Sequence, residues 1–327
     1  MKRLIVALIV LTLAGGFALA GGQAEGSGAG NGEVRQISIA GAGSAGTFYV
    51  MATGFADLIN QEMGIGAVSE VTAGSVENAN LIDGQQVEFG VMQLDVAQNA
   101  VAGQAQFDSP KELTAVTPMY PNLVQIVTLE DSSIETFADL EGKRVSVGSP
   151  GSGILATNRV IFETLGMSLE DDIRPQYLSF AETTTAFRDG SVDAVIVNTA
   201  APSPFLVDLE TTHPIKTIEL TDEQISAFTD AYPYYVEATI PANAYQTIDS
   251  DTKTFAVWIT LMTYADMSED VVYDVVKTIH ENPEFLADVH VVSQYVNIDN
   301  VPAISGVPFH PGAARYYAEH DVDVATD

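Results

Sequence analysis

The sequence contains no cysteine. This absence excludes disulfides, cysteine nucleophiles, thiolate metal ligands and a lipid anchor attached through cysteine. It does not identify the compartment, because an oxidising compartment permits disulfides without requiring them. A chain of 327 residues can also build an apolar core without such cross-links.

Basic residues are scarce as well. The chain has 13 Lys and Arg against 44 Asp and Glu, which gives a formal net charge of -31. A protein that binds nucleic acid needs a basic surface to replace the counterions of the phosphates. Nucleic acid is therefore not expected as a partner.

Long apolar runs are missing after the N-terminus, so we expect no membrane-spanning helix in the mature chain. The N-terminus itself has the pattern of a signal peptide over residues 1–20: Lys2 and Arg3, an apolar run at 4–14, and Ala18-Leu19-Ala20 before the cut. The apolar run is shorter than the roughly 20 residues of a spanning helix. Residues 21–33 are rich in Gly and Ala and are predicted to be a flexible linker. This start predicts a periplasmic protein.

Strand and helix patterns alternate from residue 34 onwards. We predict strands at 34–40, 67–72, 89–92, 113–119, 124–128, 145–147, 176–178 and 194–197. We predict helices at 47–62, 76–83, 95–102, 153–165, 182–189, 251–264, 268–282 and 313–320. This alternation is typical of an α/β fold with a mainly parallel sheet covered by helices on both faces. Trp258 is expected in the core, within the helix at 251–264.

Two similar α/β stretches suggest two lobes around a cleft. We predict one lobe from residues 34–121 plus 236–327 and the other from residues 122–235, so that the C-terminal helices return to the first lobe. The chain would cross between the lobes near 120–124 and 230–240. Aromatic residues lie at both crossings, Tyr120 at the first and 232–235 at the second, where they could line the cleft or stiffen a hinge.

Three Gly- and Ser-rich turns, at 41–49, 72–78 and 148–153, each follow a predicted strand and begin a helix. The first N–H groups of a helix have no partner within it, and the helix dipole adds partial positive charge there. Such ends bind anions without Lys or Arg. Each turn could instead be an ordinary helix cap, but three of them at the carboxyl ends of strands favour a ligand site.

A nucleotide site and an enzyme site are the rival interpretations. Residues 41–46 match G-x-G-x-x-G, yet the acidic residue expected about 20 positions later is missing from a strand end, because Glu62 ends a predicted helix. The five histidines show no metal-ligand spacing, and no nucleophile with its base is recognisable. We therefore expect no enzyme activity, no cofactor and no metal.

Several short motifs, in order along the chain, resemble one family. They are Gly46-Thr47-Phe48-Tyr49, Gly74-Ser75-Val76-Glu77-Asn78, Gln93-Leu94-Asp95-Val96-Ala97, Leu140 to Gly148, Pro150-Gly151-Ser152-Gly153, Gly190-Ser191-Val192-Asp193-Ala194 and Ile240-Pro241-Ala242. With this set the chain resembles the TAXI-type extracytoplasmic solute receptors of TRAP (tripartite ATP-independent periplasmic) transporters. The departures are Ala45, Asn243 and Thr199-Ala200-Ala201-Pro202, which stand where relatives carry other residues.

The resemblance implies a type II periplasmic-binding-protein fold and a monomer that delivers its solute to the TRAP membrane subunits. It implies a small carboxylate as ligand, such as glutamate, 2-oxoglutarate or a related dicarboxylate. The ligand-binding residues that it implies are Ser44, Thr47, Tyr49, Ser75, Asn78, Gln93, Asp95, Tyr120, Ser149, Ser152 and Gly153. Asp95 would repel an anion, so it would either orient a hydroxyl donor or accept from an ammonium group. A sensory module, an ABC-transporter receptor and an extracellular enzyme on the same fold stay open as alternatives.

Overall fold

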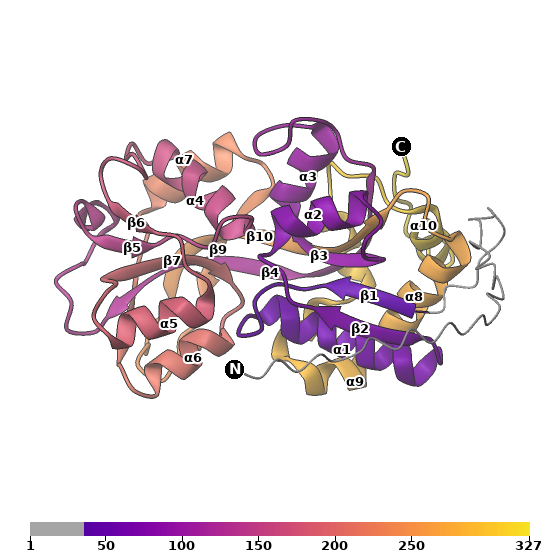
Figure 1. Ribbon diagram of the computed structural model, residues 1–327, viewed down its shortest axis with the longest axis horizontal. Helices are drawn as coiled ribbons and strands as arrows, with labels where there is room; N and C mark the ends of the chain where they lie inside the picture. The colour runs from indigo at the N-terminus through magenta and orange to yellow at the C-terminus, as the bar shows by residue number, and fades with distance from the viewer. Residues whose placement is uncertain (1–35) are drawn as a thin grey trace, which may run out of the picture. The chain divides into compact units, whose positions relative to one another are not determined.

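The computed structural model describes residues 36–327 (Figure 1). The predicted signal peptide and linker lie outside the described residues. Within the described range, no helix has the length and the apolar character needed to span a membrane.

Ten strands and ten α-helices make up this range, together with three short 3₁₀ helices. The first half contains β1 (Gln36–Ala40), α1 (Thr47–Glu62), β2 (Gly66–Glu70), α2 (Ser75–Asp83), β3 (Phe89–Gln93), α3 (Leu94–Ala102), β4 (Leu113–Leu129), η1 (Phe137–Leu140), β5 (Arg144–Ser146) and α4 (Gly153–Thr164). The second half contains β6 (Arg174–Gln176), α5 (Phe180–Arg188), β7 (Ala194–Thr199), α6 (Pro204–Glu210), β8 (Ile215–Ile218), α7 (Asp222–Ala231), β9 (Tyr235–Ile240), β10 (Thr252–Tyr264), α8 (Glu269–Glu281), α9 (Pro283–Val289), η2 (Val291–Tyr295), η3 (Ile298–Ala303) and α10 (Pro311–Ala318).

The strands form one mixed sheet in the order β2-β1-β3-β10-β4-β7-β5-β6, with β8 beside β4 and β9 beside β10. Strand β1 is parallel to β2 and β3, and β5 is parallel to β6 and β7. The long strands β4 and β10 are antiparallel to each other and to their other neighbours. The prediction of a mainly parallel sheet is therefore wrong, because local strand–helix alternation does not reveal the two long strands that join the parallel groups.

Strand β10 corrects the predicted helix at 251–264. Its 13 residues are buried on both faces along most of their length and are rich in β-branched and aromatic types. A continuous apolar run of this kind does not distinguish a buried strand from a buried helix. Trp258 is half-buried in this strand, with its ring perpendicular to that of Tyr295. In β4, the two strands predicted at 113–119 and 124–128 form one strand, although Pro118 and Pro121 lack the N–H of a regular ladder.

Helices cover both faces of the sheet (Figure 1). At one end of the sheet, α2 and α3 lie on one side and α1 on the other. At the other end, α4 and α7 lie opposite α5 and α6. Helices α8 and α9 pack against α1, so the C-terminal segment lies beside the first helix of the described chain.

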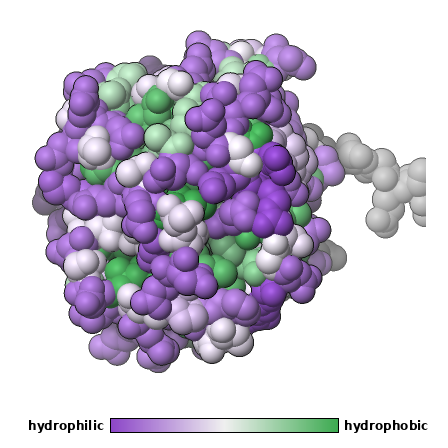
Figure 2. Space-filling view, turned by 90° about the vertical axis from the view of Figure 1, so that its left-hand side faces the viewer, coloured by the Kyte–Doolittle hydropathy of each residue, from purple (hydrophilic) through white to green (hydrophobic). Residues whose placement is uncertain are grey.

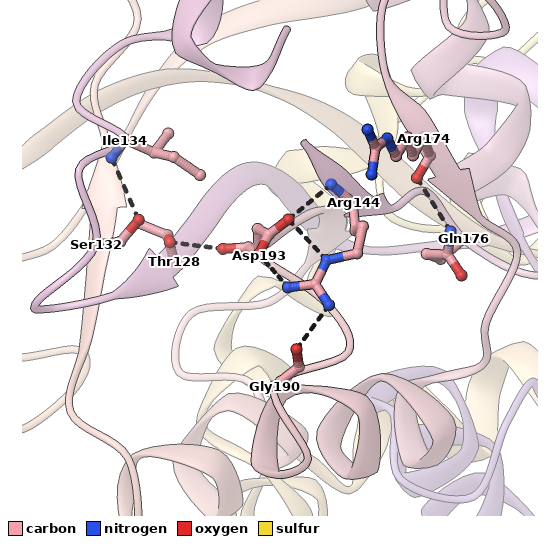
Figure 3. Close-up of polar contacts among 8 residues, drawn as sticks. All are labelled: Thr128, Ser132, Ile134, Arg144, Arg174, Gln176, Gly190 and Asp193. Atoms are coloured by element: carbon pink, nitrogen blue, oxygen red, sulfur yellow. Dashed lines mark hydrogen bonds and ion pairs between the residues drawn. The ribbon is translucent and has the colours of Figure 1, made fainter. Parts of the chain in front are cut away.

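The ion pair of Arg144 and Asp193 fastens β5 to the turn before β7 (Figure 3). The Arg144 backbone N–H and Nε donate to Asp193 Oδ2 at 2.8 and 3.0 Å, and Nη1 donates to the Gly190 carbonyl at 2.7 Å. Thr128 Oγ1, on β4, donates to the Asp193 carbonyl at 2.7 Å. The Arg144 guanidinium lowers the pKa of Asp193. Two of the motifs that carry the family resemblance, residues 140–148 and 190–194, are therefore in contact, and this contact is structural.

Figure 2 shows the end of the molecule that carries β5, β6, α5 and α6. Its surface is mostly hydrophilic, and its hydrophobic residues lie in small groups. Such a surface agrees with the strongly negative net charge, which favours solubility.

Candidate functional site

A cavity of about 390 Å³ lies beside the carboxyl ends of the parallel strands. The loops that follow β1, β2, β5 and β6 line it, as do the last residues of β3 and β7. In an open α/β sheet, the crevice outside the carboxyl ends of the strands is the usual place of a ligand. Its volume is that of a site for a small molecule.

Four helices begin at this cavity. Their first residues are Thr47 in α1, Ser75 in α2, Gly153 in α4 and Phe180 in α5, and all four line the cavity wall. Each helix directs unpaired N–H groups and the positive end of its dipole towards its first turn. Among the described residues, those that line the cavity include no Asp, Glu, Lys, Arg or His. The cavity thus offers partial positive charge from the backbone and no full charge from side chains.

Two side chains in the cavity wall are buried and lack hydrogen-bond partners within residues 36–327. They are the Thr47 hydroxyl and both polar atoms of the Asn198 amide. Thr47 is 1% exposed and Asn198 is 2% exposed. A buried polar group without a partner costs about 1–3 kcal/mol, and such groups in native proteins call for an explanation. A polar ligand in the cavity would supply the missing partners.

Seven of the eleven predicted ligand-binding residues line the cavity: Ser44, Thr47, Ser75, Gln93, Ser149, Ser152 and Gly153. Three of their side chains, those of Ser75, Gln93 and Ser152, already make hydrogen bonds to the protein. Ser75 Oγ accepts from the Gln93 backbone N–H at 3.0 Å, and Ser152 Oγ caps α4 by accepting from the Leu155 N–H at 3.1 Å. Both hydroxyl groups keep a proton that could be donated to a ligand.

The other four predicted residues, Tyr49, Asn78, Asp95 and Tyr120, do not line the cavity. Asn78 Nδ2 donates to the carbonyls of Gly41 and Val91 at 2.7 and 2.8 Å, which ties α2 to the end of β1 and to β3. Tyr120 is fully buried in β4, and its hydroxyl has no partner among the described residues.

Asp95, in the first turn of α3, belongs to a buried network directly behind Gln93. Its carboxylate accepts from the Tyr235 hydroxyl at 2.6 Å, from Thr157 Oγ1 at 3.1 Å and from Gln93 Nε2 at 3.3 Å. Burial raises the pKa of Asp95, and the hydrogen bond from Tyr235 opposes this shift most strongly. The network joins α3 and Gln93 to α4 and β9, which lie in different parts of the chain.

The two sides of the cavity also touch directly. The Glu77 backbone N–H, in α2, donates to the Gly151 carbonyl at 3.2 Å. A Cβ added to Gly46 would lie 2.7 Å from the ring of Phe180, so glycine is needed there for the close approach of α1 and α5. Phe180 in turn stacks on Phe205 with ring centroids 4.3 Å apart.

Sequence reasoning missed several residues of the cavity wall, among them Leu178, Ser179, Phe180, Asn198 and Thr199. Two signals could have found them. Asn198 and Thr199 end the apolar strand that begins at residue 194, and the strand ends of an α/β fold are where ligands bind. Ser179 begins the capping box Ser-Phe-Ala-Glu of α5, a recognisable helix start.

No group of three or more His, Asp or Glu within residues 36–327 is placed to hold a metal ion. The tyrosines at 232–235 do not line the cavity. Tyr235 instead packs against Phe228 and Phe255, with ring centroids 4.7 and 5.4 Å away.

The solved structures that are similar to this chain include binding proteins of transport systems. The alkanesulfonate-binding protein of Xanthomonas axonopodis pv. citri, bound to MOPS, is 18% identical with a TM-score of 0.52 over 88% of this chain and 84% of that one. The periplasmic aliphatic sulphonate-binding protein of Escherichia coli is 18% identical, with a TM-score of 0.47 over 89% and 85% of the two chains. A putative L-cystine ABC transporter protein of Listeria monocytogenes is 14% identical, with a TM-score of 0.49 over 80% and 96%.

The first of these likenesses confirms the predicted fold class, because at this identity it concerns the fold: α/β, of the periplasmic-binding-protein type. A family model gives the more specific result. The model of the NMT1-like family matches residues 39–320, which is most of the chain. The chain therefore belongs to the NMT1-like family.

Proposed function

We propose that this protein is an exported solute-binding protein, not an enzyme, which captures a small anion in the cavity and delivers it to a membrane transporter. The observation that carries the proposal is the composition of the cavity wall. Four helix N-termini converge on a wall without charged side chains, and that wall holds the unpartnered Thr47 and Asn198.

An anion fits this wall better than a cation or a sugar. Backbone N–H groups and Ser or Thr hydroxyls donate hydrogen bonds, and four helix dipoles add partial positive charge. A cation would find no carboxylate in the wall. The apolar side chains of Phe48, Ile154, Leu178 and Phe180 complete the lining and suit a ligand with a short carbon chain.

Within the anions, we propose a small carboxylate such as glutamate, 2-oxoglutarate or a related dicarboxylate. The resemblance to TAXI-type receptors supports this class. A sulfonate is the second candidate, because the protein of Xanthomonas axonopodis pv. citri with the same fold is an alkanesulfonate-binding protein with MOPS bound. Both groups are anions that accept several hydrogen bonds, so the chemistry of the wall suits either one.

The transporter partner is proposed on the same basis. The resemblance supports the membrane subunits of a TRAP transporter, with the protein acting as a monomer in the periplasm after removal of residues 1–20. An ABC transporter stays an alternative partner, because solved proteins similar to this chain include a putative L-cystine ABC transporter protein. A sensory module is a further alternative and would use the same cavity. A gene for a multi-spanning TRAP permease beside this one would favour the first partner, and an ABC ATPase gene or a histidine kinase gene would favour the others.

Capture is proposed to occur by closure of two lobes, residues 34–121 plus 236–327 and residues 122–235. Strands β4 and β10 are the segments that extend through both ends of the sheet, so bending within them would move the lobes. Closure around the ligand would remove water and strengthen its polar contacts.

A thermal-shift screen of the mature chain tests the proposal. L-Glutamate and its diamide form one matched pair, and L-malate and L-malamide form another, because each amide keeps the shape and loses the negative charge. Propanesulfonate, MOPS, glucose and choline complete the set. A ligand present at a hundredfold excess over its Kd stabilises the native state by about 2.7 kcal/mol. The proposal expects a shift of several degrees from a carboxylate or a sulfonate and none from the matched amide. Equal shifts from acid and amide, or a shift from glucose or choline alone, would contradict it.

A further inference from the structure

We propose that Asp95 selects the ligand through Gln93, by holding the Gln93 amide so that its carbonyl oxygen faces the cavity. The solute would then have to donate a hydrogen bond at that point. This inference rests on the proposed function and narrows it to carboxylates that carry an amino or hydroxyl group, as opposed to keto acids.

The Gln93 side chain is held by two acceptors on its nitrogen. Nε2 donates to Thr157 Oγ1 at 3.0 Å and to Asp95 Oδ1 at 3.3 Å, so both of its protons are used. Oε1 accepts no hydrogen bond from any residue in the described range, although Gln93 is only 2% exposed. An amide with its nitrogen fixed in this way presents its oxygen on the opposite side.

Gly153 shows where that oxygen lies. A Cβ added to Gly153 would be 2.6 Å from Gln93 Oε1 and 2.9 Å from Ser75 Oγ. Gly153 is the first residue of α4, and it lines the cavity together with Gln93 and Ser75. The oxygen is therefore placed at the start of two helices, α2 and α4, whose N–H groups would hold the carboxylate of the same ligand.

In its ionised form Asp95 fixes the orientation, because a carboxylate only accepts hydrogen bonds. The Tyr235 and Thr157 hydroxyls donate hydrogen bonds to its Oδ2, and the Gln93 amide nitrogen donates one to its Oδ1. If the Gln93 amide were flipped, its oxygen would face Oδ1 across 3.3 Å in a buried site, with two acceptors and no proton between them. Replacing the Asp95 carboxylate by an amide removes this restriction, because an amide can donate to a flipped Gln93.

The consequence is a donor requirement on the ligand. An ammonium or hydroxyl group next to the carboxylate would donate to Gln93 Oε1, whereas a keto oxygen would face it as a second acceptor. A site built to hydrogen-bond one group discriminates strongly against an analogue that leaves a buried group unpaired. Asp95 contacts no ligand in this account and acts as a positioning residue.

Calorimetric titration with matched sets of ligands tests the inference. One set is L-glutamate, 2-hydroxyglutarate and 2-oxoglutarate, and the other is L-alanine, L-lactate and pyruvate. We expect the wild-type chain to bind the amino or hydroxy acid of a set at least ~10-fold more tightly than the keto acid. Asp95→Asn should reduce this ratio at least ~5-fold, since either amide orientation becomes available. Asp57→Asn, the same exchange on the exposed face of α1, should leave the ratio unchanged.

Gln93→Met is a second test that does not depend on the buried carboxylate. It keeps the length of the side chain and removes Oε1, so the preference for a donor should disappear. Its folding and that of Asp95→Asn are checked by circular dichroism, and one folded variant suffices. A wild-type preference for the keto acid, or an unchanged ratio in a folded variant, overturns the inference and leaves the anion site standing. A wild-type chain that binds no carboxylate overturns the inference together with the carboxylate assignment.

Discussion

The hydroxyl of Tyr235 lies 2.6 Å from Oδ2 of Asp95, in a fully buried contact between β9 and α3. The same hydroxyl lies 3.2 Å from Oγ1 of Thr157 in α4. Three segments that are far apart in the chain therefore share one hydrogen-bond network behind the cavity. Because Asp95 is buried, this network determines both the stability of the region and the orientation of Gln93.

Removing the Tyr235 donor should destabilise the fold. We expect Tyr235→Phe to lower the free energy of unfolding by about 1.5–3 kcal/mol, the usual value of a hydrogen bond to a charged group. Tyr232→Phe is the matched control, because Tyr232 belongs to the same aromatic cluster. Urea unfolding measures both variants. Equal losses in the two would show that the contact with Asp95 contributes little.

The unpartnered hydroxyl of Thr47 should matter for the ligand and not for the fold. Thr47→Val keeps the shape of the side chain and removes a buried polar atom that has no partner in the described residues. We expect unfolding of the ligand-free chain to be unchanged or shifted to higher urea. Ligand affinity should fall about 5- to 10-fold, the effect of one hydrogen bond.

Thr254→Val is the control for this variant. Thr254 Oγ1 donates to the Val124 carbonyl at 2.6 Å within the sheet, and Thr254 does not line the cavity. This exchange should destabilise the chain and leave the affinity unchanged. If Thr47→Val lowered the stability without changing the ligand affinity, and Thr254→Val lowered the affinity, Thr47 would not be part of the ligand site.

The contact of Gly46 with Phe180 should control closure of the cavity. In Gly46→Ala the new methyl group would lie 2.7 Å from the Phe180 ring, although the backbone at Gly46 is extended and accepts alanine. We expect ligand affinity to fall about 10-fold in calorimetry, from a steric cost of the order of 1–3 kcal/mol. A double-mutant cycle isolates the cause. In the Phe180→Ala background, Gly46→Ala should have no further effect, and a full additional loss would disprove the steric explanation.

His280 should make the fold sensitive to acid. Burial, and to a lesser degree the nearby His320, lowers the pKa of His280 from its usual 6.5 to about 4. Since the unfolded chain binds the proton near pH 6.5 and the folded chain only near pH 4, the contribution of His280 to stability is present above pH 6.5. It is lost as the pH falls from 6.5 towards 4, and it amounts to at most about 3 kcal/mol.

His280→Gln measures this contribution, because glutamine does not titrate and can still bond to Thr117, which lies 2.9 Å from Nε2 of His280. We expect the wild type to lose more stability than this variant between pH 7 and pH 4.5 in urea unfolding. His213→Gln is the control, because His213 lies between α6 and β8 and away from His280. The loss of stability in this variant should match that of the wild type. Parallel pH profiles of the wild type and His280→Gln would contradict the assignment.

The sequence predicted well what depends on local patterns. The helix expected at 47–62 is α1, with the same bounds, because its apolar spacing and its Gly-rich start are both local signals. The three Gly- and Ser-rich turns do meet at one cavity, because the carboxyl ends of parallel strands lie at the same edge of a sheet. The fourth turn, before Phe180, has the same character but a less conspicuous sequence.

The features that the sequence did not predict depend on contacts between residues that are far apart in the chain. Nothing local distinguishes Asn78, whose amide lies within hydrogen-bond distance of carbonyls at the end of β1 and within β3, from a residue that faces the ligand. The partners of Asp95 include Tyr235, 140 positions further along the chain. The apolar run of β10 could not be separated from a helix, because its burial comes from segments that are distant in the chain, among them the helices α2, α3 and α7 that pack on it.

The central claim, that a wall of helix N-termini binds an anion, is tested most directly at Ser149. This half-buried residue lines the cavity, and Ser149→Asn and Ser149→Asp introduce side chains of nearly the same shape that differ by one negative charge. The measurement is calorimetric titration of both variants with the ligand found in the thermal-shift screen. The account predicts that Ser149→Asp binds at least ~10-fold more weakly than Ser149→Asn, from like-charge repulsion in a cavity of low dielectric constant. Equal affinities of the two variants would show that the ligand carries no negative charge there and would contradict the account.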